Sequence, residues 1–179
     1  FKPVHWCLDC ASALAEAEVE YYDKVSPAID VEFSVVDVAD FTARSGIKAT
    51  APALVIWTTT PWTIPANRAV AVHPQLDYVL LSGELDGQHL ELLVAEALAD
   101  DLVERWGMES VTRSTTVKGE KLEALSLQHP FLGAQVPVIL GEHVTTDAGT
   151  GLVHTAPGHG ADDFVVGQQY DLDPISPVL

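Results

Sequence analysis

Hydroxyl side chains are concentrated in one short segment, which runs from Trp57 to Arg68 and reads WTTTPWTIPANR. Four threonines lie within six residues, and Pro61 and Pro65 exclude a regular ladder of backbone hydrogen bonds there. Hydroxyls held on such a loop can donate to and accept from a small polar ligand or a water molecule. The alternative is a threonine-rich strand end whose hydroxyls bond only to nearby backbone. The residue types alone leave both interpretations open.

A second candidate segment runs from residue 149 to residue 164 and reads GTGLVHTAPGHGADDF. Its glycines would let backbone approach a ligand closely, and its polar residues allow three functional interpretations. His154, His159 and Asp163 are potential metal ligands, although their spacing matches none of the usual zinc signatures. Asp147 begins a DAGT stretch similar to an aspartic-protease loop, but no second loop of that kind supplies the paired carboxylate. In the third interpretation an unpaired aspartate binds a substrate ammonium while His154 shapes the pocket.

The acidic pair in this segment also fits a purely structural role, because Asp162 or Asp163 would suit the positive end of a helix that begins there. No lysine follows the glycines in the manner of a phosphate-binding loop, and no serine lies in a Gly-x-Ser-x-Gly elbow. A protein nucleophile is therefore poorly supported. Direct attack by a positioned water molecule fits the residues that remain.

Both cysteines lie in one Cys7-Leu8-Asp9-Cys10 pair near the start of the sequence. Two thiolates make half of a tetrahedral zinc site, so two more ligands would have to come from elsewhere. A redox dithiol is the alternative, but the strand–turn–helix pattern of thioredoxin-like motifs does not surround the pair. We therefore expect half of a metal knuckle, with no firmly bound metal in this chain.

The 179 residues carry 26 acidic and nine basic side chains, for a net charge of -17. Such a field repels polyanions, so a general electrostatic grip on nucleic acid is not expected. Four cations fall in one short segment that could make a local phosphate contact, namely Arg105, Arg113, Lys118 and Lys121. Singly solvated cations on an acidic surface are the simpler interpretation.

The remaining composition favours a globular cytoplasmic enzyme. With 47% hydrophobic residues the chain can bury a sizeable core, and one domain is the usual number for this length. The sequence contains neither the roughly 18 apolar residues in a row that a membrane-spanning helix needs nor a signal peptide. Because it begins with Phe1 and its single methionine is Met108, we expect it to be a piece of a longer protein.

Hydrophobic periodicity and turn residues predict the elements that must position these segments. Helices are predicted over 11–22, 94–106 and from about 162 to 170, with Ser12 as candidate N-cap of the first and Gly107 ending the second. Strands are predicted over 29–38, 53–58, 69–72, 78–82, 89–94, 111–117, 136–140 and 152–155, with a hairpin turn at Asp86-Gly87. In the first of them one face is predicted to carry Ile29, Val31, Phe33 and Val35. Six or more short strands with a few peripheral helices indicate an α+β fold, either a β-barrel or a folded sheet.

The residues of the two segments also resemble a known family. The run from Trp57 to Arg68 resembles the threonine-rich segment of isoleucyl-tRNA synthetases, and the run 149–164 resembles the second editing-site segment of the same enzymes. The opening PVHWCLDCASALAEAEVEYYDK is similar to the stretch where the synthetase body leads into its inserted editing domain. Valyl and leucyl enzymes carry arginine where Thr60 stands, so the resemblance is to the isoleucyl editing insertion.

This resemblance implies a mostly β, α+β fold, with a closed β-barrel of about six strands and peripheral helices. Residues 1–25 would form a junction with the synthetase body, comprising the half zinc knuckle and a helix. Residues 26–179 would form the editing domain.

The resemblance also implies proofreading. A pocket shaped for isoleucine cannot strongly exclude valine, because one missing methylene changes binding by only about 1–3 kcal/mol, a value for which isoleucyl-tRNA synthetases are themselves the standard example. A second, size-selective site would hydrolyse valyl-tRNA(Ile), with valyl-adenylate as a further candidate substrate, by means of a positioned water. The synthetic site would lie outside this chain. Two alternatives stay open: a non-catalytic module that binds tRNA or an amino acid, and a metal-dependent hydrolase that uses His154, His159 and Asp163.

The family's functional positions carry over residue by residue. Asp163 matches the carboxylate that holds the substrate's α-ammonium, and His154 matches the side chain that closes the pocket to isoleucine. Thr58, Thr59 and Thr60 match positions that bind substrate or orient the water, and with Asp163 they form the expected catalytic set. The remaining substrate-binding positions match Trp62, Thr63 and Asn67.

Cofactors and partners follow from the same resemblance. No cofactor is expected in the editing site, whereas Cys7 and Cys10 would supply half of a zinc site whose other cysteine pair lies beyond Leu179. The partners would be the 3′ end of tRNA(Ile), an adenylate or adenosine ester of valine, and the rest of a cytoplasmic synthetase chain, with no membrane. Since the domain is strongly acidic, we expect it to bind tRNA weakly on its own and to edit more slowly than the intact enzyme.

Overall fold

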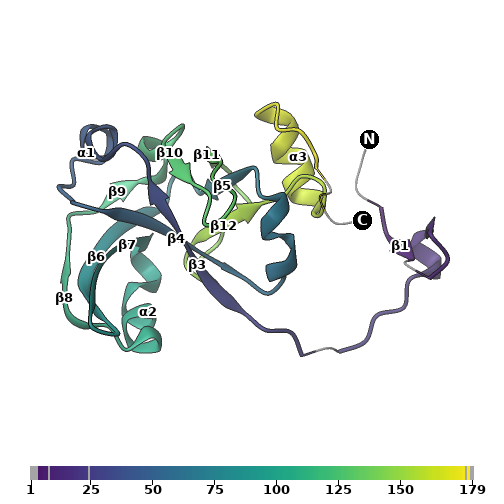
Figure 1. Ribbon diagram of the computed structural model, residues 1–179, viewed down its shortest axis with the longest axis horizontal. Coiled ribbons are helices and arrows are strands. Elements are labelled where there is room, and N and C mark those ends of the chain that lie inside the picture. Colours follow the sequence, from purple (N-terminus) through teal and green to yellow (C-terminus); the bar gives the residue numbers. More distant parts are fainter. Residues whose placement is uncertain (1–3, 8, 24, 176, 178–179) are drawn as a thin grey trace.

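The computed structural model describes residues 4–7, 9–23, 25–175 and 177. Ten strands form one mixed sheet in the order β12-β5-β11-β10-β3-β4-β7-β6-β8, with β9 paired to β6 (Figure 1). Their bounds are β3 (Ile29–Val35), β4 (Pro52–Thr58), β5 (Ala69–Val72), β6 (Asp77–Leu85), β7 (Gln88–Ala95), β8 (Glu109–Arg113), β9 (Val117–Lys118), β10 (Ser126–Gln128), β11 (Gln135–Leu140) and β12 (Leu152–Thr155). A separate hairpin consists of β1 (Trp6–Cys7) and β2 (Ser12–Ala13), and it lies apart from the main sheet (Figure 1).

Alternating side chains give the strands their faces. In β3 the predicted face holds, since Phe33 and Val35 are buried while their neighbours in the strand point outward. Strand β4 is buried on both faces, because Leu54 and Ile56 join the central core whereas Ala53 and Val55 face a second cluster. The β6–β7 hairpin turns at the predicted pair, whose φ values of 51° at Asp86 and 77° at Gly87 are those of a type I′ turn.

Three α-helices cover the sheet: α1 (Val38–Ser45), α2 (Ala99–Trp106) and α3 (Ala161–Gln169). Helix α2 packs through Leu102 on the outer face of β4, β6 and β7. Helix α3 packs through Val166 on the outer face of β5 and β11. Short 3-10 helices connect other elements, namely η1 (Glu16–Glu18), η2 (Pro61–Ala66), η3 (Glu96–Leu98) and η4 (Gly119–Leu122). Among the described residues, no helix combines the length and apolarity that crossing a membrane requires.

The predicted closed barrel is wrong: the sheet is open and mixed. Its inner face does surround one core to which β3, β4, β5, β6, β7, β10, β11 and β12 all contribute, so the sheet folds over itself. In the described part of the chain, however, its end strands do not pair with each other, since β12 pairs with β5 alone and β8 with β6 alone. Alternation in a sequence predicts which face of each strand is buried, but it does not predict whether the two end strands meet.

The predicted helix over 11–22 is also wrong. Ser12 lies in β2, opposite Cys7, and the helical part is limited to the single turn of η1. Every described residue from 11 to 22 is exposed or only partly buried, so this segment has no apolar face packed against the body. A short helix is marginal in water without such packing, even when it contains good helix formers.

The other predictions need smaller corrections. The predicted helix 94–106 begins only at Ala99, because Val94 and Ala95 still belong to β7, and it ends before Gly107 as expected, at a φ of 66°. The predicted strand 29–38 ends at Val35, and α1, which begins at Val38, was not predicted. The predicted strand 111–117 is divided into β8 and β9, and β10 was not predicted. The final helix matches the prediction to within one residue at each end.

Candidate functional site

The two candidate segments, far apart in the sequence, meet at one pocket. Thr58 ends β4, Thr63 lies in η2, His154 lies in β12, and Asp163 lies in the first turn of α3. These four residues line a cavity of about 230 Å³ together with Thr60. The structure therefore brings together most of the predicted site residues.

The imidazole of His154 is fixed at both nitrogens. Its Nε2 lies 2.8 Å from Thr63 Oγ1, and its Nδ1 lies 3.0 Å from Asn67 Nδ2. Its side chain is 7% exposed. Burial lowers the pKa of His154 to about 4, with smaller contributions from the charges of His159 and His129. The ring is therefore a neutral, immobile wall of the pocket at physiological pH.

Threonine hydroxyls form a chain along one side of the pocket. Thr58 Oγ1 accepts from the backbone N–H of Thr60 at 3.1 Å and lies 3.3 Å from Thr60 Oγ1. Thr60 Oγ1 in turn lies 3.4 Å from Thr63 Oγ1, whose hydroxyl donates to the Thr60 carbonyl at 2.8 Å. The bonds to nearby backbone that the sequence allowed are thus present, and the hydroxyls of Thr58 and Thr60 also line the cavity. Such hydroxyls can still bond a water or a ligand oxygen.

Asp163 is the carboxylate of the pocket. Its Oδ2 accepts from the Ala156 N–H at 2.8 Å, which ties the start of α3 to the end of β12. Burial raises the pKa of Asp163, and the Ala156 bond opposes that rise. Gly160 precedes α3 with no side-chain cap, and a Cβ there would lie 3.1 Å from Oδ2 of Asp163. Asp162 and Asp163 do lie in the first turn of α3, at its positive end as predicted, but the N-cap residue is Gly160, and Asp163 bonds the backbone before the helix instead of capping it.

Three predicted residues lie outside this cavity. Trp62 is 57% exposed. Thr59 is exposed, and its carbonyl oxygen accepts from Ser26 Oγ at 2.7 Å. Asn67 is buried behind His154 and contacts the ring from the side away from the cavity lining. Neither Trp62 nor Thr59 lines the cavity, and Asn67 is placed to act through the histidine.

A second pocket of about 330 Å³ adjoins the first and shares Trp57, Thr58 and Val153 with it. Thr59 also lines this second pocket. Gly149 closes one side at a φ of 80°, where a Cβ would lie 3.1 Å from the Trp57 ring. No role was predicted for Trp57, although it begins the threonine-rich segment. Its position between the two pockets depends on long-range packing that no local signal reveals.

The cysteine pair lies in the β1–β2 hairpin, which lies apart from the main sheet (Figure 1), and neither cysteine lines either pocket. The Cys10 N–H donates to Cys7 Sγ at 3.3 Å, and this bond is the main cause of the lowered pKa of Cys7. A lowered pKa favours the thiolate, which is the form that binds metals. Within the described ranges, no group of three or more His, Cys, Asp and Glu side chains is placed to hold a metal ion.

The predicted cluster of cations does not form a free phosphate site. Each of three cations contacts an aspartate: Arg105 with Asp30, Arg113 with Asp100, and Lys118 with Asp77. Arg105 and its neighbour Trp106 both donate to Asp30, at 2.6 and 2.9 Å, and so fasten α2 to β3. These ion pairs neutralise the cations in place.

The family model that matches most of the chain, together with the fold, identifies an editing domain of an aminoacyl-tRNA synthetase. The chain belongs to the family described as "Leucyl-tRNA synthetase, editing domain", whose model matches residues 43–179. The solved editing domain of the P. knowlesi cytosolic leucyl-tRNA synthetase superposes with a TM-score of 0.68 at 12% identity, over 86% of this chain and 66% of that one. At that identity the likeness concerns the fold.

Sequence relatives point to a particular branch of the family. The chain is 84% identical over 179 residues to isoleucine–tRNA ligase of Alcanivorax borkumensis and covers 19% of that protein. It is 55% identical over 183 residues to isoleucine–tRNA ligase of Pseudoalteromonas atlantica, again covering 19% of its length. The chain thus spans about a fifth of these relatives. The predicted resemblance to isoleucyl editing insertions is confirmed.

Proposed function

We propose that the 230 Å³ pocket hydrolyses the ester bond of valine misattached to tRNA(Ile), and that it also accepts valyl-adenylate. The observation that carries this proposal is the placement of one partly buried carboxylate and one neutral histidine in the same pocket, beside a chain of hydroxyls. A free amino acid ester presents the matching groups: an ammonium, a small side chain and a carbonyl open to attack.

Asp163 is proposed to bind the α-ammonium. It is the carboxylate that lines the pocket, and one of its oxygens already bonds the Ala156 N–H, which holds the group in place. A charge-assisted bond to the ammonium would fix the direction of the ester carbonyl. The substrate charge would also favour the ionised carboxylate despite its burial.

His154 is proposed to exclude isoleucine. Its ring is fixed by hydrogen bonds at both nitrogens, so it cannot rotate away from a larger side chain without breaking one of them. Forcing an extra methylene into a rigid site costs roughly 1–3 kcal/mol. Valine, which is smaller by one methylene, would avoid this clash.

The hydroxyls of Thr58 and Thr60 are proposed to orient the attacking water, with Thr59 binding substrate in the adjoining pocket. That 330 Å³ pocket shares a wall with the first and is proposed to hold the terminal adenosine. A substrate that spans both pockets would place its ester between them, near Thr58.

A metal-dependent hydrolase fits the geometry less well. The lone pair of His154 Nδ1 already accepts from Asn67, and its Nε2 faces the Thr63 hydroxyl. Coordination by His154 would therefore break a buried hydrogen bond. A non-catalytic module that binds tRNA or an amino acid is the second candidate. Release of valine from valyl-tRNA(Ile) would distinguish the editing hydrolase from such a module.

The proposal for the whole protein is a cytoplasmic isoleucine–tRNA ligase that contains this editing domain and binds tRNA(Ile). Cys7 and Cys10 are proposed to contribute two thiolates to a zinc site completed elsewhere in that protein. The division into a junction over 1–25 and an editing domain over 26–179 is part of the same proposal.

The test is deacylation by the 179-residue chain, at micromolar concentration, of valyl-tRNA(Ile) and of isoleucyl-tRNA(Ile). We expect release of valine and little release of isoleucine. His154→Ala should raise cleavage of the isoleucyl ester by roughly 5- to 150-fold, which corresponds to the 1–3 kcal/mol of the relieved clash. His89→Ala is the matched control, since His89 lies on β7 with partners Ser82 and Glu84, outside both pockets.

Equal cleavage of both esters by the unmodified chain would contradict the size-selective pocket. Loss of activity on addition of a chelator would favour the metal-dependent reaction. Release no faster than spontaneous hydrolysis would favour the binding module.

A further inference from the structure

Asn67 is buried at the junction of η2 and β5. Its side chain is 3% exposed, and its backbone N–H donates to the Ile64 carbonyl at 2.9 Å. The side chain reaches His154 from behind the pocket and does not line the cavity. A direct contact with substrate therefore does not explain its polarity.

The surroundings determine which way the Asn67 amide points. The carbonyl oxygen of Ala69 can only accept, so the side-chain atom 2.9 Å away from it is the NH₂ nitrogen. The second N–H of that nitrogen faces His154 Nδ1 at 3.0 Å. Nδ1 must then accept, and the neutral imidazole carries its proton on Nε2.

The remaining bonds agree with this tautomer. His154 Nε2–H donates to Thr63 Oγ1 at 2.8 Å, and the Thr63 hydroxyl donates its own hydrogen bond to the Thr60 carbonyl at 2.8 Å. Each donor in the chain therefore meets one acceptor. One acceptor is left over: Asn67 Oδ1 is buried and has no hydrogen-bond partner among the described residues. An unpartnered acceptor costs free energy, so the two bonds that the NH₂ group donates are what favours asparagine at this position.

We propose that Asn67 is a positioning residue: it holds His154 as the uncharged Nε2–H tautomer and fixes the orientation of its ring. The consequence for the reaction rests on the proposed function, because an uncharged wall does not repel the ammonium that Asp163 binds. The tautomer itself does not depend on that function.

The electrostatic surroundings support the uncharged ring. Protonation at Nδ1 would point two N–H groups at each other, and burial already lowers the pKa of His154 to about 4. The titratable groups near the ring are His159 in the bend before α3, His129 after β10 and Asp163 across the pocket. The two histidines disfavour a charge on His154, and Asp163 favours one.

The first experiment is nitrogen-15 NMR of histidine-labelled chain. We expect His154 to show the Nε2–H tautomer and to stay neutral down to a pH of about 4. Asn67→Ala should let His154 populate both tautomers. Asn67→Asp places a carboxylate against Nδ1 and should raise the pKa of His154 by roughly 1–3 pH units.

His129 is the internal control in the same spectra. It is also buried, its Nε2 donates to the Ile64 carbonyl at 3.0 Å, and its Nδ1 accepts from the N–H groups of Phe131 and Leu132. His129 should keep its Nε2–H tautomer in both variants, because the Ile64 carbonyl still accepts from it, and loss of its signals would mark a variant that is unfolded. If Asn67→Asp does not fold, Asn67→Ala decides the question.

A second readout is deacylation of valyl-tRNA(Ile) by Asn67→Asp. The imidazolium should raise KM about tenfold at pH 6 relative to pH 8, with a smaller change in kcat, because like charges meet in the pocket. An Nδ1–H tautomer in the unmodified chain, or an unchanged His154 signal in folded Asn67→Ala, would overturn the positioning role. A confirmed tautomer combined with an unchanged KM would count against the proposed function instead.

Discussion

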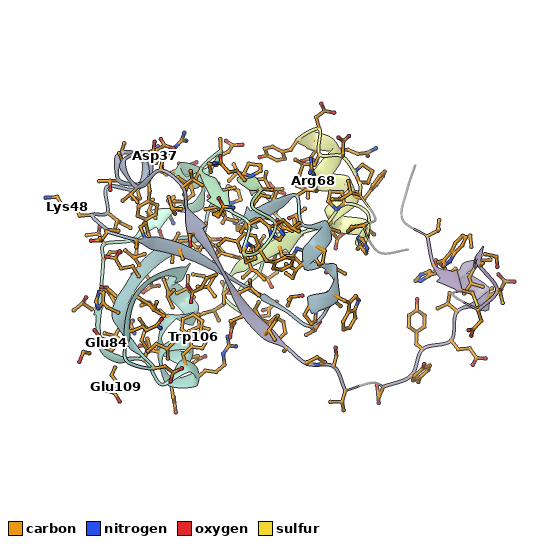
Figure 2. The ribbon with its side chains drawn as sticks, in the orientation of Figure 1. Asp37, Lys48, Arg68, Glu84, Trp106 and Glu109 are labelled. Atoms are coloured by element: carbon orange, nitrogen blue, oxygen red, sulfur yellow. The ribbon has the colours of Figure 1, made fainter. Side chains whose placement is uncertain are left out.

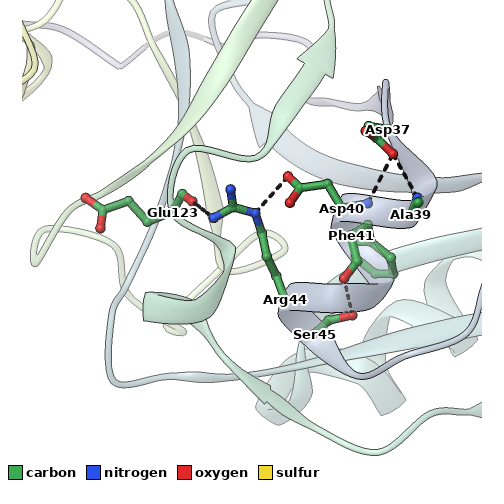
Figure 3. A network of polar contacts seen from close by, with 7 residues as sticks. All are labelled: Asp37, Ala39, Asp40, Phe41, Arg44, Ser45 and Glu123. Atoms are coloured by element: carbon green, nitrogen blue, oxygen red, sulfur yellow. Dashed lines mark hydrogen bonds and ion pairs between the residues drawn. The ribbon is translucent and has the colours of Figure 1, made fainter.

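The end of the molecule around α1 and the pocket end at α3 differ in how completely their polar groups are hydrogen-bonded. Figure 2 shows Asp37 and Lys48 at the α1 end and Arg68 close to α3. At the α1 end, Asp37 caps the helix by accepting from the Ala39 and Asp40 N–H groups at 2.9 and 3.1 Å (Figure 3). Gly46 ends the helix at a φ of 73°, as a left-handed C-terminal glycine should.

The polar groups of this end are matched locally. Arg44 bonds Asp40 one turn earlier at 2.7 Å and also donates to the Glu123 carbonyl at 2.8 Å (Figure 3). The Ser45 hydroxyl donates to the Phe41 carbonyl, and the Phe41 ring is fully buried beneath the helix. Local sequence and tertiary contacts therefore favour the same structure here.

Near the pocket some buried polar atoms lack a hydrogen-bond partner. The buried polar atoms without a hydrogen-bond partner in the described chain are Asn67 Oδ1, Arg68 Nε, His143 Nε2 and Thr155 Oγ1. They belong to the end of η2, to β12 and to the wall of the adjoining pocket. Both η2 and α3 begin without a side-chain cap. The comparison teaches that the unpartnered buried polar atoms of the described chain lie near the two pockets, where the proposed substrate would bind, and not at the α1 end.

The largest effect should come from Asp163→Asn, which separates ligand binding from stability. Losing a charge-assisted bond of roughly 1.5–3 kcal/mol, together with the orientation it gives, should lower kcat/KM for valyl-tRNA(Ile) by about 100-fold or more. Stability should not fall. Burial raises the pKa of Asp163, so its ionised form opposes folding at neutral pH, and an amide oxygen can still accept from Ala156.

The measurement is single-turnover deacylation beside a thermal melt at pH 7. We expect an equal or higher melting temperature for the variant. A large drop in melting temperature would mean that the carboxylate is a structural group, and the contrast between the two ends would then disappear.

A pH series tests whether the pocket destabilises the fold in acid. The folded pKa of His154 is about 4, below the ordinary 6.5, so the unfolded chain takes up this proton first as pH falls. The stability linked to His154 is therefore complete above pH 6.5 and is lost on going down to pH 4, by on the order of 3 kcal/mol. Urea unfolding of the chain at pH 7 and pH 4.5 measures the loss.

His154→Gln is the control, because glutamine does not titrate and should remove most of this pH dependence. Asp163 acts in the opposite direction, since its raised pKa adds stability as it becomes protonated in acid. Because both chains contain Asp163, the difference between their stability–pH profiles gives the contribution of His154 alone. Identical pH profiles would show that His154 is not held neutral.

Features that depend on near neighbours in the sequence were predicted better than contacts between distant segments, although α1 itself was missed. The Asp86-Gly87 turn, the end of α2 at Gly107 and the buried face of β3 depend on neighbours within a few residues, and these predictions are confirmed. The helix over 11–22 was predicted from helix-forming residues and a candidate N-cap at Ser12, and it fails because none of its residues is buried against the body.

For the pocket, the types of the site residues could be predicted from the sequence but their contacts could not. His154 lies 91 residues from Thr63, and only the folded sheet brings them within 2.8 Å. The place of Asn67 behind the histidine, and of Trp57 between the pockets, depends on such long-range packing. The open end of the sheet depends on it as well, since alternation does not determine whether end strands pair.

The smallest effect should come from Asp37→Ala at the opposite end. Removing an N-cap aspartate costs about 0.5–2 kcal/mol, because two backbone N–H groups lose their acceptor. Asp37→Asn retains a capping oxygen and should cost much less. Urea unfolding measures both variants, and valyl-tRNA(Ile) deacylation should match the unmodified chain in each. A loss of editing in folded Asp37→Ala would show that α1 is coupled to the pocket, through Arg44, Glu123 and the Tyr170 hydroxyl that donates to Glu123 at 2.7 Å.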